Sequence, residues 1–424
     1  MWPPSYDTCC SACSGSSSVT PVSVGGTQID AFGRLRVSQP YTLFDSQQRY
    51  ALDWTFTSNT ASGGSVTFVP TQSTANLQVT STVGSFAARE TRYVFVYQPG
   101  KSLLSLMTFV MSPASVGNLR QRVGYFGSDN GYFLELKDQL YMVERSNVTG
   151  TITETYVPQS QWNIDTLQGQ GISGATLDIT KAQIFWLDME WLGVGTVRTG
   201  FVINGQFYPA HYFHHANLLK TVYITTATLP VRYEIQTIAA GAPATSNLLQ
   251  ICSCVQSEGG YDQPLLLFSN ISNFSNTMTA GVWYPTVSIR LAPGRLDGVA
   301  QIRQVDVVVT SADTIHWGLW SNVTTTNLTG ANFVAHASSQ VVQIDNSAVA
   351  LNTTGCQQVA AGIISGTNQS AAAMSLELTK YYSQIGRNSF TQTSDIMTLA
   401  YYSTTTITGS PVKVQGLLSW NELL

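Results

Sequence analysis

Charged side chains are scarce in this chain of 424 residues. It has 20 Lys and Arg and 24 Asp and Glu, so that 10% of its residues are charged, where an ordinary soluble domain carries roughly 25%. A protein that stays alone in water needs charges dispersed over its surface. The composition therefore indicates a protein that hides much of its exterior against neighbouring chains.

Other absences exclude whole classes of function. No apolar run approaches the ~18 residues that a membrane-spanning helix needs. The net charge of −4 and the count of only six lysines provide no basic surface for nucleic acid. Nucleophile-elbow, phosphate-loop and dinucleotide motifs are missing, so we expect no catalytic residue and no cofactor. The cysteine cluster Cys9, Cys10 and Cys13 lacks a nearby fourth ligand, and we expect no metal site.

What the sequence does contain is a repeated β pattern. With 43% hydrophobic and 11% aromatic residues it has ample material for a core. Short runs rich in Val, Ile, Thr, Tyr and Phe, such as residues 92–97 and 220–224, alternate with Gly, Asn, Asp and Pro. Asn204-Gly205 between two such runs predicts a tight hairpin. The regular spacing favours two β-sandwiches or jelly rolls over a barrel, with one helical candidate at residues 371–380.

Breaks in this pattern divide the chain into three parts. Residues 11–26 are rich in Ser and Gly and are typical of an extended arm. Gly259-Gly260 is the strongest later break. We therefore predict an all-β protein with an N-terminal arm or docking segment (1–47), a lectin- or concanavalin-like β-sandwich (48–262) and a C-terminal β domain (263–424).

One strand carries a pair of carboxylates. Asp188 and Glu190 alternate along a predicted strand and so share a face. The stretch from Trp186 to Trp191 is similar to the Glu-x-Asp-x-x-Glu strand of laminarinase-type glycoside hydrolases, in which paired carboxylates act as nucleophile and acid. Here tryptophan stands at both outer glutamate positions, which leaves those roles vacant. The alternative is a glycan-facing surface, in which Trp186, Trp191 and Tyr212 stack on sugars beside Asp188 and Glu190.

A histidine cluster at residues 211–215 has two interpretations. His211 and His215 share a strand face, and Asp188 could complete a metal site with them. The alternative, which we favour, is a strand end with aromatic packing and solvent-exposed imidazoles.

The most specific pattern is the stretch from Ile29 to Gln47, IDAFGRLRVSQPYTLFDSQ. It resembles a segment near the start of uncharacterised virion structural proteins from tailed phages and other large DNA viruses. Further matches follow in the same order at residues 162–165, 191–198, 229–234, 394–399 and 419–422. The resemblance implies a component of the viral particle, located in the virion, in the capsid or in a tail or fibre.

The same segment has the chemistry of a docking strip. Its apolar anchors are spaced along it, and two arginines can make forked hydrogen bonds to a partner. The residues that we expect to dock are Phe32, Arg34, Leu35, Arg36, Tyr41 and Phe44. The alternative is that this stretch is the first strand of the protein's own sandwich.

These observations give three expectations for function. The first is a non-enzymatic virion structural protein whose partners are other virion proteins and copies of itself, with no direct contact to nucleic acid or membrane. The second is a module that binds a host-surface glycan. The third is a glycoside hydrolase that rests on Asp188 and Glu190 alone.

Overall fold

The computed structural model describes residues 39–114, 117–262, 267–367, 372–378 and 383–423. All its regular elements in these ranges are strands, apart from two short 3-10 turns at Gln159–Gln161 and Thr325–Asn327. No helix in the described ranges is long and apolar enough to cross a membrane. The prediction of an all-β chain is confirmed.

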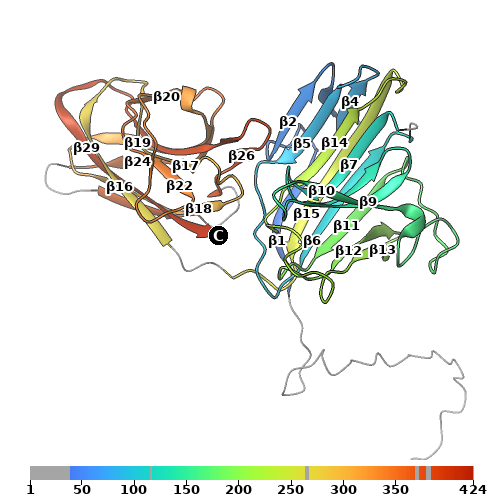
Figure 1. The fold of residues 1–424 in the computed structure, drawn as a ribbon. Coiled ribbons are helices and arrows are strands. Elements are labelled where there is room, and N and C mark those ends of the chain that lie inside the picture. Colours follow the sequence, from blue (N-terminus) through green and yellow to red (C-terminus); the bar gives the residue numbers. More distant parts are fainter. Residues whose placement is uncertain (1–38, 115–116, 263–266, 368–371, 379–382, 424) are drawn as a thin grey trace, which may run out of the picture. The chain divides into compact units, whose positions relative to one another are not determined.

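The first sandwich consists of two antiparallel sheets (Figure 1). We call the first the β11 sheet, and its strands in spatial order are β13 (Gln206–Phe213), β12 (Val197–Ile203), β11 (Gln183–Met189), β6 (Leu103–Met111), β15 (Thr245–Ser257), β4 (Thr74–Thr80) and β3 (Ser65–Val69), with β1 (Tyr41–Gln47) paired to β15. We call the second the β7 sheet, and its order is β10 (Thr153–Pro158), β9 (Leu140–Ser146), β8 (Gly131–Leu136), β7 (Leu119–Phe126), β14 (Val231–Thr237), β5 (Phe86–Thr91) and β2 (Phe56–Ala61).

Side-chain alternation along these strands builds the core between the two sheets. In β6, every second residue from Leu103 to Met111 is buried, and the residues between them are half-buried. Phe185, Leu187 and Val123 belong to the same continuous apolar cluster. Each sheet thus directs one face inward and presents the other face outward.

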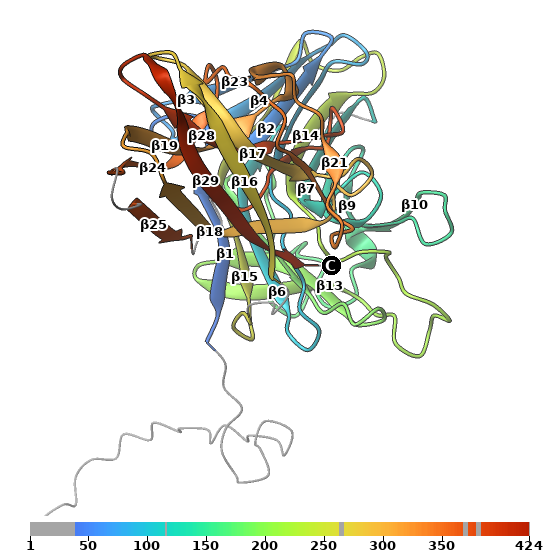
Figure 2. The same cartoon turned by 90° about the vertical axis from the view of Figure 1, so that its left-hand side faces the viewer.

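The second sandwich is made by the strands that follow residue 266 (Figure 2). Its four-stranded sheet has the order β16 (Leu267–Met278), β29 (Ile407–Leu423), β18 (Val299–Val309) and β25 (Ala372–Glu377). Its larger sheet contains β20 (Leu328–Thr329), β23 (Ala350–Leu351), β17 (Trp283–Leu291), β28 (Ile396–Tyr402), β19 (Thr314–Val323) and β24 (Gln357–Ser365), with β22 (Val342–Asp345) on β17 and β21 (Val334–Ala335) on β22. A small pair is formed by β26 (Arg387–Asn388) and β27 (Thr393–Ser394).

Two predicted segment boundaries, at residues 262 and 47, fall within the described residues. The change from one set of strands to the other lies between Ser257 and Leu267, a span that contains the predicted boundary at residue 262. The predicted arm boundary at residue 47 lies inside the sandwich, because residues 41–47 form β1 and pair with β15.

The predicted helix at residues 371–380 is wrong. Residues 372–377 form β25, which pairs antiparallel with β18. The alanines favour a helix when considered alone, but pairing with a neighbouring strand overrides this local preference.

Candidate functional site

Three of the five predicted glycan-facing residues lie on one surface. Phe185, Leu187 and Met189 of β11 point into the core, so Trp186 and Asp188 occupy the outward face. Arg198 of β12 pairs with Asp188 in register, and Tyr212 of β13 pairs with Arg198. Residues paired in register share a face, so Trp186, Asp188 and Tyr212 belong to the outward face of the β11 sheet.

The position of the Trp186 ring requires a glycine at the neighbouring position on β12. Gly200 is its partner on β12, and a Cβ at Gly200 would lie 2.8 Å from two atoms of the indole ring. The ring of Phe207 also packs against Trp186 at a centroid distance of 5.7 Å. These neighbours leave Trp186 only 5% exposed, and its indole Nε1 has no hydrogen-bond partner among the described residues.

Asp188 is buried beside a cation that remains accessible to solvent. Its Oδ2 accepts a hydrogen bond from Arg198, whose side chain is half-exposed. Burial raises the pKa of Asp188, and Arg198 offsets only part of this effect. The Ser102 hydroxyl lies between two carboxylates: it donates to Glu258 at 3.0 Å and also lowers the pKa of Asp188, whereas the charge of Glu258 raises it.

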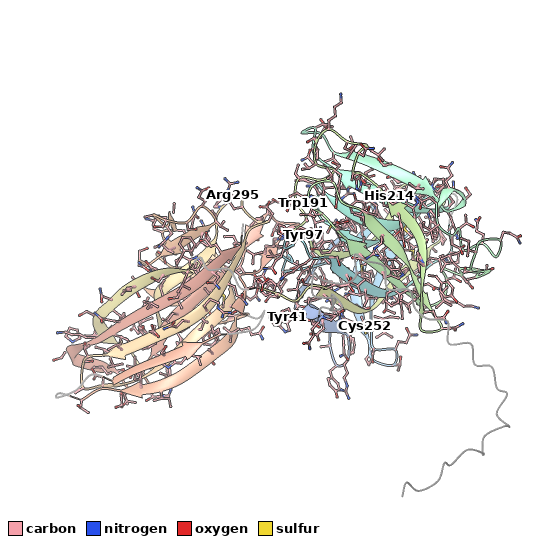
Figure 3. The ribbon with its side chains drawn as sticks, turned by 90° about the horizontal axis from the view of Figure 1, so that it is seen from below. Tyr41, Tyr97, Trp191, His214, Cys252 and Arg295 are labelled. Atoms are coloured by element: carbon pink, nitrogen blue, oxygen red, sulfur yellow. The ribbon has the colours of Figure 1, made fainter. Side chains whose placement is uncertain are left out.

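Glu190 and Trp191 lie just beyond the strand that carries this surface. The strand ends at Met189, and Glu190 follows it, where its backbone N–H donates to the Thr196 carbonyl at 3.2 Å and its Oε2 accepts the Thr196 N–H at 3.4 Å. The Trp191 ring meets Tyr97 edge-on at 5.9 Å, and its Nε1 donates to the Ile224 carbonyl (Figure 3). Asp188 and Glu190 are therefore held by different local structures.

The structure separates the histidines from Asp188. The imidazole of His211 is buried, which lowers its pKa to about 4. His215 lies 2.8 Å from Glu144, and no metal-ligating cluster occurs among the described residues. Both His211 and His215 are buried, which corrects the expectation of solvent-exposed imidazoles at this strand end.

Sequence reasoning missed a polar cluster centred on Glu144. His215 Nδ1 lies 2.6 Å from the Gly195 carbonyl oxygen, so it must donate there, while its Nε2 lies 2.8 Å from Glu144 Oε2. The Tyr132 hydroxyl donates to the same oxygen at 2.8 Å. Tyr223 stacks on the His215 ring at 3.9 Å. These contacts link residues of both sheets, and 71 positions separate Glu144 from His215, so no local pattern in the sequence signals the pair.

The outward face of the β7 sheet carries a network of ion pairs. Arg122 donates to Glu135 at 2.6 Å, and both side chains are almost fully buried. Glu234 lies 2.6 Å from Arg232 and 3.7 Å from Arg122. Burial alone would raise the pKa of Glu234, but the surrounding arginines hold it below its usual value.

Aromatic rings complete this network. The guanidinium of Arg122 lies over Phe133 at 4.9 Å, and that of Arg145 lies over the same ring at 5.1 Å. Arg145 also pairs with Glu154 at 2.6 Å. The sequence contains a signal for this face, since Arg or Glu stands at every second position within 119–123 and 231–235, a period of two that directs every charge to one side.

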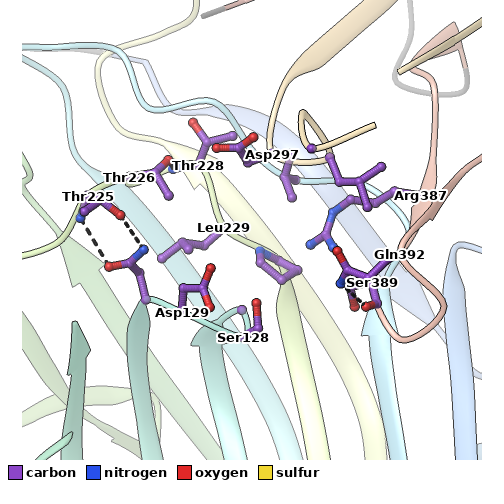
Figure 4. Close-up of a pocket in the computed structure, with 16 residues that line it drawn as sticks. Ser128, Asp129, Thr225, Thr226, Thr228, Leu229, Asp297, Arg387, Ser389 and Gln392 are labelled. Atoms are coloured by element: carbon purple, nitrogen blue, oxygen red, sulfur yellow. Dashed lines mark hydrogen bonds between the residues drawn. The ribbon is translucent and has the colours of Figure 1, made fainter. Parts of the chain in front are cut away.

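A polar pocket of about 250 Å³ is a further site that sequence reasoning missed (Figure 4). Its lining includes Asp129, Thr225, Asp297 and Arg387. Thr225 is held by Asn130, whose Nδ2 donates to the Thr225 hydroxyl at 2.7 Å. Arg387 is paired with Glu90 at 2.9 Å. None of the predicted site residues lines this pocket.

The predicted docking strip is only partly described. Phe32, Arg34, Leu35 and Arg36 lie outside the described residues. Tyr41 is 44% exposed and stacks on Tyr261. Phe44 is fully buried in the sandwich core, so it is not available as an anchor for a partner, and this position follows the alternative of an internal first strand.

Comparisons with known proteins give only distant likenesses. No protein-family model matches the chain, and no curated protein matches it. Similar solved structures include a β-glucanase from Bacillus licheniformis (12% identity, 50% of this chain and 96% of that chain, TM-score 0.32) and peanut lectin (10%, 52% and 98%, 0.29). Another is a carbohydrate esterase from the Shiga toxin-encoding bacteriophage phi24B (11%, 52% and 100%, 0.30). Scores this low carry no argument about function.

Proposed function

We propose that this chain is a non-enzymatic structural component of a viral particle, in the capsid or in a tail or fibre. In this role it packs against copies of itself or other particle proteins through the outward face of its β11 sheet. The resemblance of residues 29–47 to virion structural proteins supports a role in a viral particle. The distribution of charge over the two sheets supports the β11 face as the surface that packs against other chains.

The observation that carries the proposal is the charge content of the two sheets. The eight strands of the β11 sheet contain three charged residues, Asp45, Asp188 and Arg198. On its outward side, Ile184 and Phe207 are 37% and 53% exposed. A face with few charges to desolvate and apolar side chains at its surface is suited to a large protein interface.

The test is incorporation into particles. The double variant Ile184→Lys with Phe207→Lys places two charges on this face and should remain folded, because it leaves the core between the sheets intact and removes only the packing of Phe207 on Trp186. We expect it to be lost from purified particles, since a buried unpaired lysine disfavours an interface. The matched control is Ile152→Lys, at an exposed position (49%) next to the β7 sheet, which should incorporate normally. Normal incorporation of the double variant would exclude this face.

A second function, glycan binding, is favoured by the polar and aromatic side chains that remain accessible on the same face. The Arg198 side chain is half-exposed and Tyr212 is partly exposed. A sugar offers hydroxyls that can accept hydrogen bonds from the guanidinium, and its ring can stack on tyrosine. If this is the function, purified protein binds members of a glycan array, and Tyr212→Ala removes the binding while Tyr156→Ala on the β7 sheet does not. An array without hits would contradict it.

We further propose that the chain does not hydrolyse glycosides. Tryptophan stands at both outer glutamate positions of the similar hydrolase strand, and the remaining Asp188 is buried against Arg198, so the nucleophile and acid roles lack their carboxylates. Assays on β-glucan and bacterial surface polysaccharide should show no turnover. Turnover that disappears in Asp188→Asn would overturn this part of the proposal.

A further inference from the structure

The four-stranded sheet of the second sandwich ends in a long strand with an open edge. Strand β16 has 12 residues and pairs with β29 on one side (Figure 2). Among the described residues, no strand pairs with its other side. Such an edge presents a row of backbone donors and acceptors to any strand that can approach.

Between Leu267 and Ser275, β16 contains none of the features that usually prevent edge pairing, and the irregularity in its pairing with β29 lies at its end, between Asn276 and Met278. From Leu267 to Met278 it has no charged residue, no proline and no glycine. Natural edge strands are commonly protected by lysine, proline or a bulge. An unprotected edge of this length indicates that it is paired in the assembled protein.

The side chains of β16 define how a partner must align. Phe268, Phe274 and Met278 pack into the core of the second sandwich, so the odd-numbered residues form the outward row. Leu267 and Ile271 in that row are 59% and 61% exposed. A partner strand must therefore place its own outward row beside these residues.

A second copy of the same strand satisfies this condition. Two identical uncharged strands meet without like-charge repulsion, and a twofold axis pairs them antiparallel. If the axis passes through Ile271, outward residues face outward residues, and Ile271 meets Ile271. Leu417, the partner of Ile271 on β29, then extends a continuous apolar row of four side chains across the two copies.

We propose that two copies of this chain join through antiparallel pairing of their β16 strands, centred on Ile271, so that two four-stranded sheets become one continuous sheet. This inference rests on the proposed function, because the β16 pairing would supply one of the contacts between copies of the chain in an assembly. It is tested on purified protein, so a negative result leaves particle incorporation as a separate question.

The first experiment measures molecular mass in solution by analytical ultracentrifugation. We expect the full chain to be a dimer, and Ile271→Lys to weaken the dimer by roughly a hundredfold or more, because two lysines would face each other at the axis. Val349→Lys, at an equally exposed position (61%) outside β16, should remain a dimer. A monomeric wild type, or a dimer unaffected by Ile271→Lys, would overturn the proposal.

The second experiment tests the register with a short thiol cross-linker. Residues opposite each other across the axis have Cβ atoms about 5 Å apart. Ile271→Cys should therefore give cross-linked dimer above the level of the wild type, whereas Asn273→Cys should not, because Asn273 faces Ser269. The opposite result would overturn the register centred on Ile271.

Discussion

The two sheets of the first sandwich share one core, but their outward faces differ in charge content. The β7 sheet contains ten charged residues in seven strands, and the β11 sheet contains three in eight strands. Most charges of the β7 sheet are engaged in internal ion pairs. The scarcity of charge in the composition is thus uneven, and it is greatest on the face that we propose for assembly.

This difference determines whether each face needs a partner chain. On the β7 sheet, arginines and glutamates neutralise each other, so the charges of this face are paired without a partner chain. On the β11 sheet, the exposed apolar side chains of Ile184 and Phe207 lie beside few charges, so covering the face removes apolar surface from water. Substitutions on each sheet test this difference.

The largest effect is expected from Arg122→Leu. This change leaves the carboxylate of Glu135 buried without its cation, and breaking such a pair typically destabilises a protein by about 3–5 kcal/mol. Urea unfolding measures the loss. The control is Lys181→Ala, which removes a solvent-exposed pair with Asp178 and should change stability much less, because water screens an exposed pair. Equal effects from the two variants would show that the network contributes no more than a surface pair.

A smaller effect is expected from Gly200→Ala on the β11 sheet. The added methyl group would meet the Trp186 indole at 2.8 Å and the Tyr208 carbonyl oxygen at 2.1 Å. Such overpacking typically costs about 1–3 kcal/mol. Tryptophan fluorescence should report the displaced ring, and urea unfolding the lost stability. Gly409→Ala, where the methyl group meets nothing within 4 Å, is the control, and a variant at Gly200 as stable as this control would contradict the packing described for Trp186.

The smallest effect is a difference in pH dependence between the faces. Because the folded state lowers the pKa of Glu234, its stabilisation is present above the unfolded value of about 4.3 and is lost as the pH falls through the lower folded pKa. Because the folded state raises the pKa of Asp188, its ionisation opposes folding, and this cost disappears as the pH falls through the raised pKa towards about 3.9.

Two variants separate these contributions. Asp188→Asn should be more stable than the wild type near neutral pH, and the difference should vanish in acid. Glu234→Gln should be less stable near neutral pH, and its deficit should shrink as the pH falls. Unfolding free energies measured across this pH range check both signs, and a loss of stability at neutral pH in Asp188→Asn would contradict the account of the β11 face.

Sequence reasoning predicted the elements that local rules control. The hairpin at Asn204-Gly205 forms, with both residues at positive φ (53° and 77°). Strand alternation placed Trp186 and Asp188 on one face. Glu190 and Trp191 lie beyond the end of β11, directly before a turn with Leu192 and Gly193 at positive φ, and a turn of this kind is not visible in a strand-like pattern.

Long-range pairing explains the remaining misses. The contact of Glu144 with His215 and the pairing of β25 with β18 join segments that are distant in sequence. The sequence left two roles open for Phe44, as an anchor for a partner chain or as a core residue of the first strand. The register of β1 on β15 decides between them. Local composition cannot supply such information, because it depends on which strands become neighbours.

If the β11 face is covered in a particle and the β7 face is not, oxidative footprinting will show a difference in reactivity between side chains on the two faces. Hydroxyl-radical labelling of free protein should modify the exposed rings of Phe207 and of Tyr156, which is 41% exposed on the β7 sheet. In intact particles, we expect Phe207 to become protected while Tyr156 remains reactive. Equal reactivity of Phe207 in the two states, or absence of the protein from purified particles, would contradict the account.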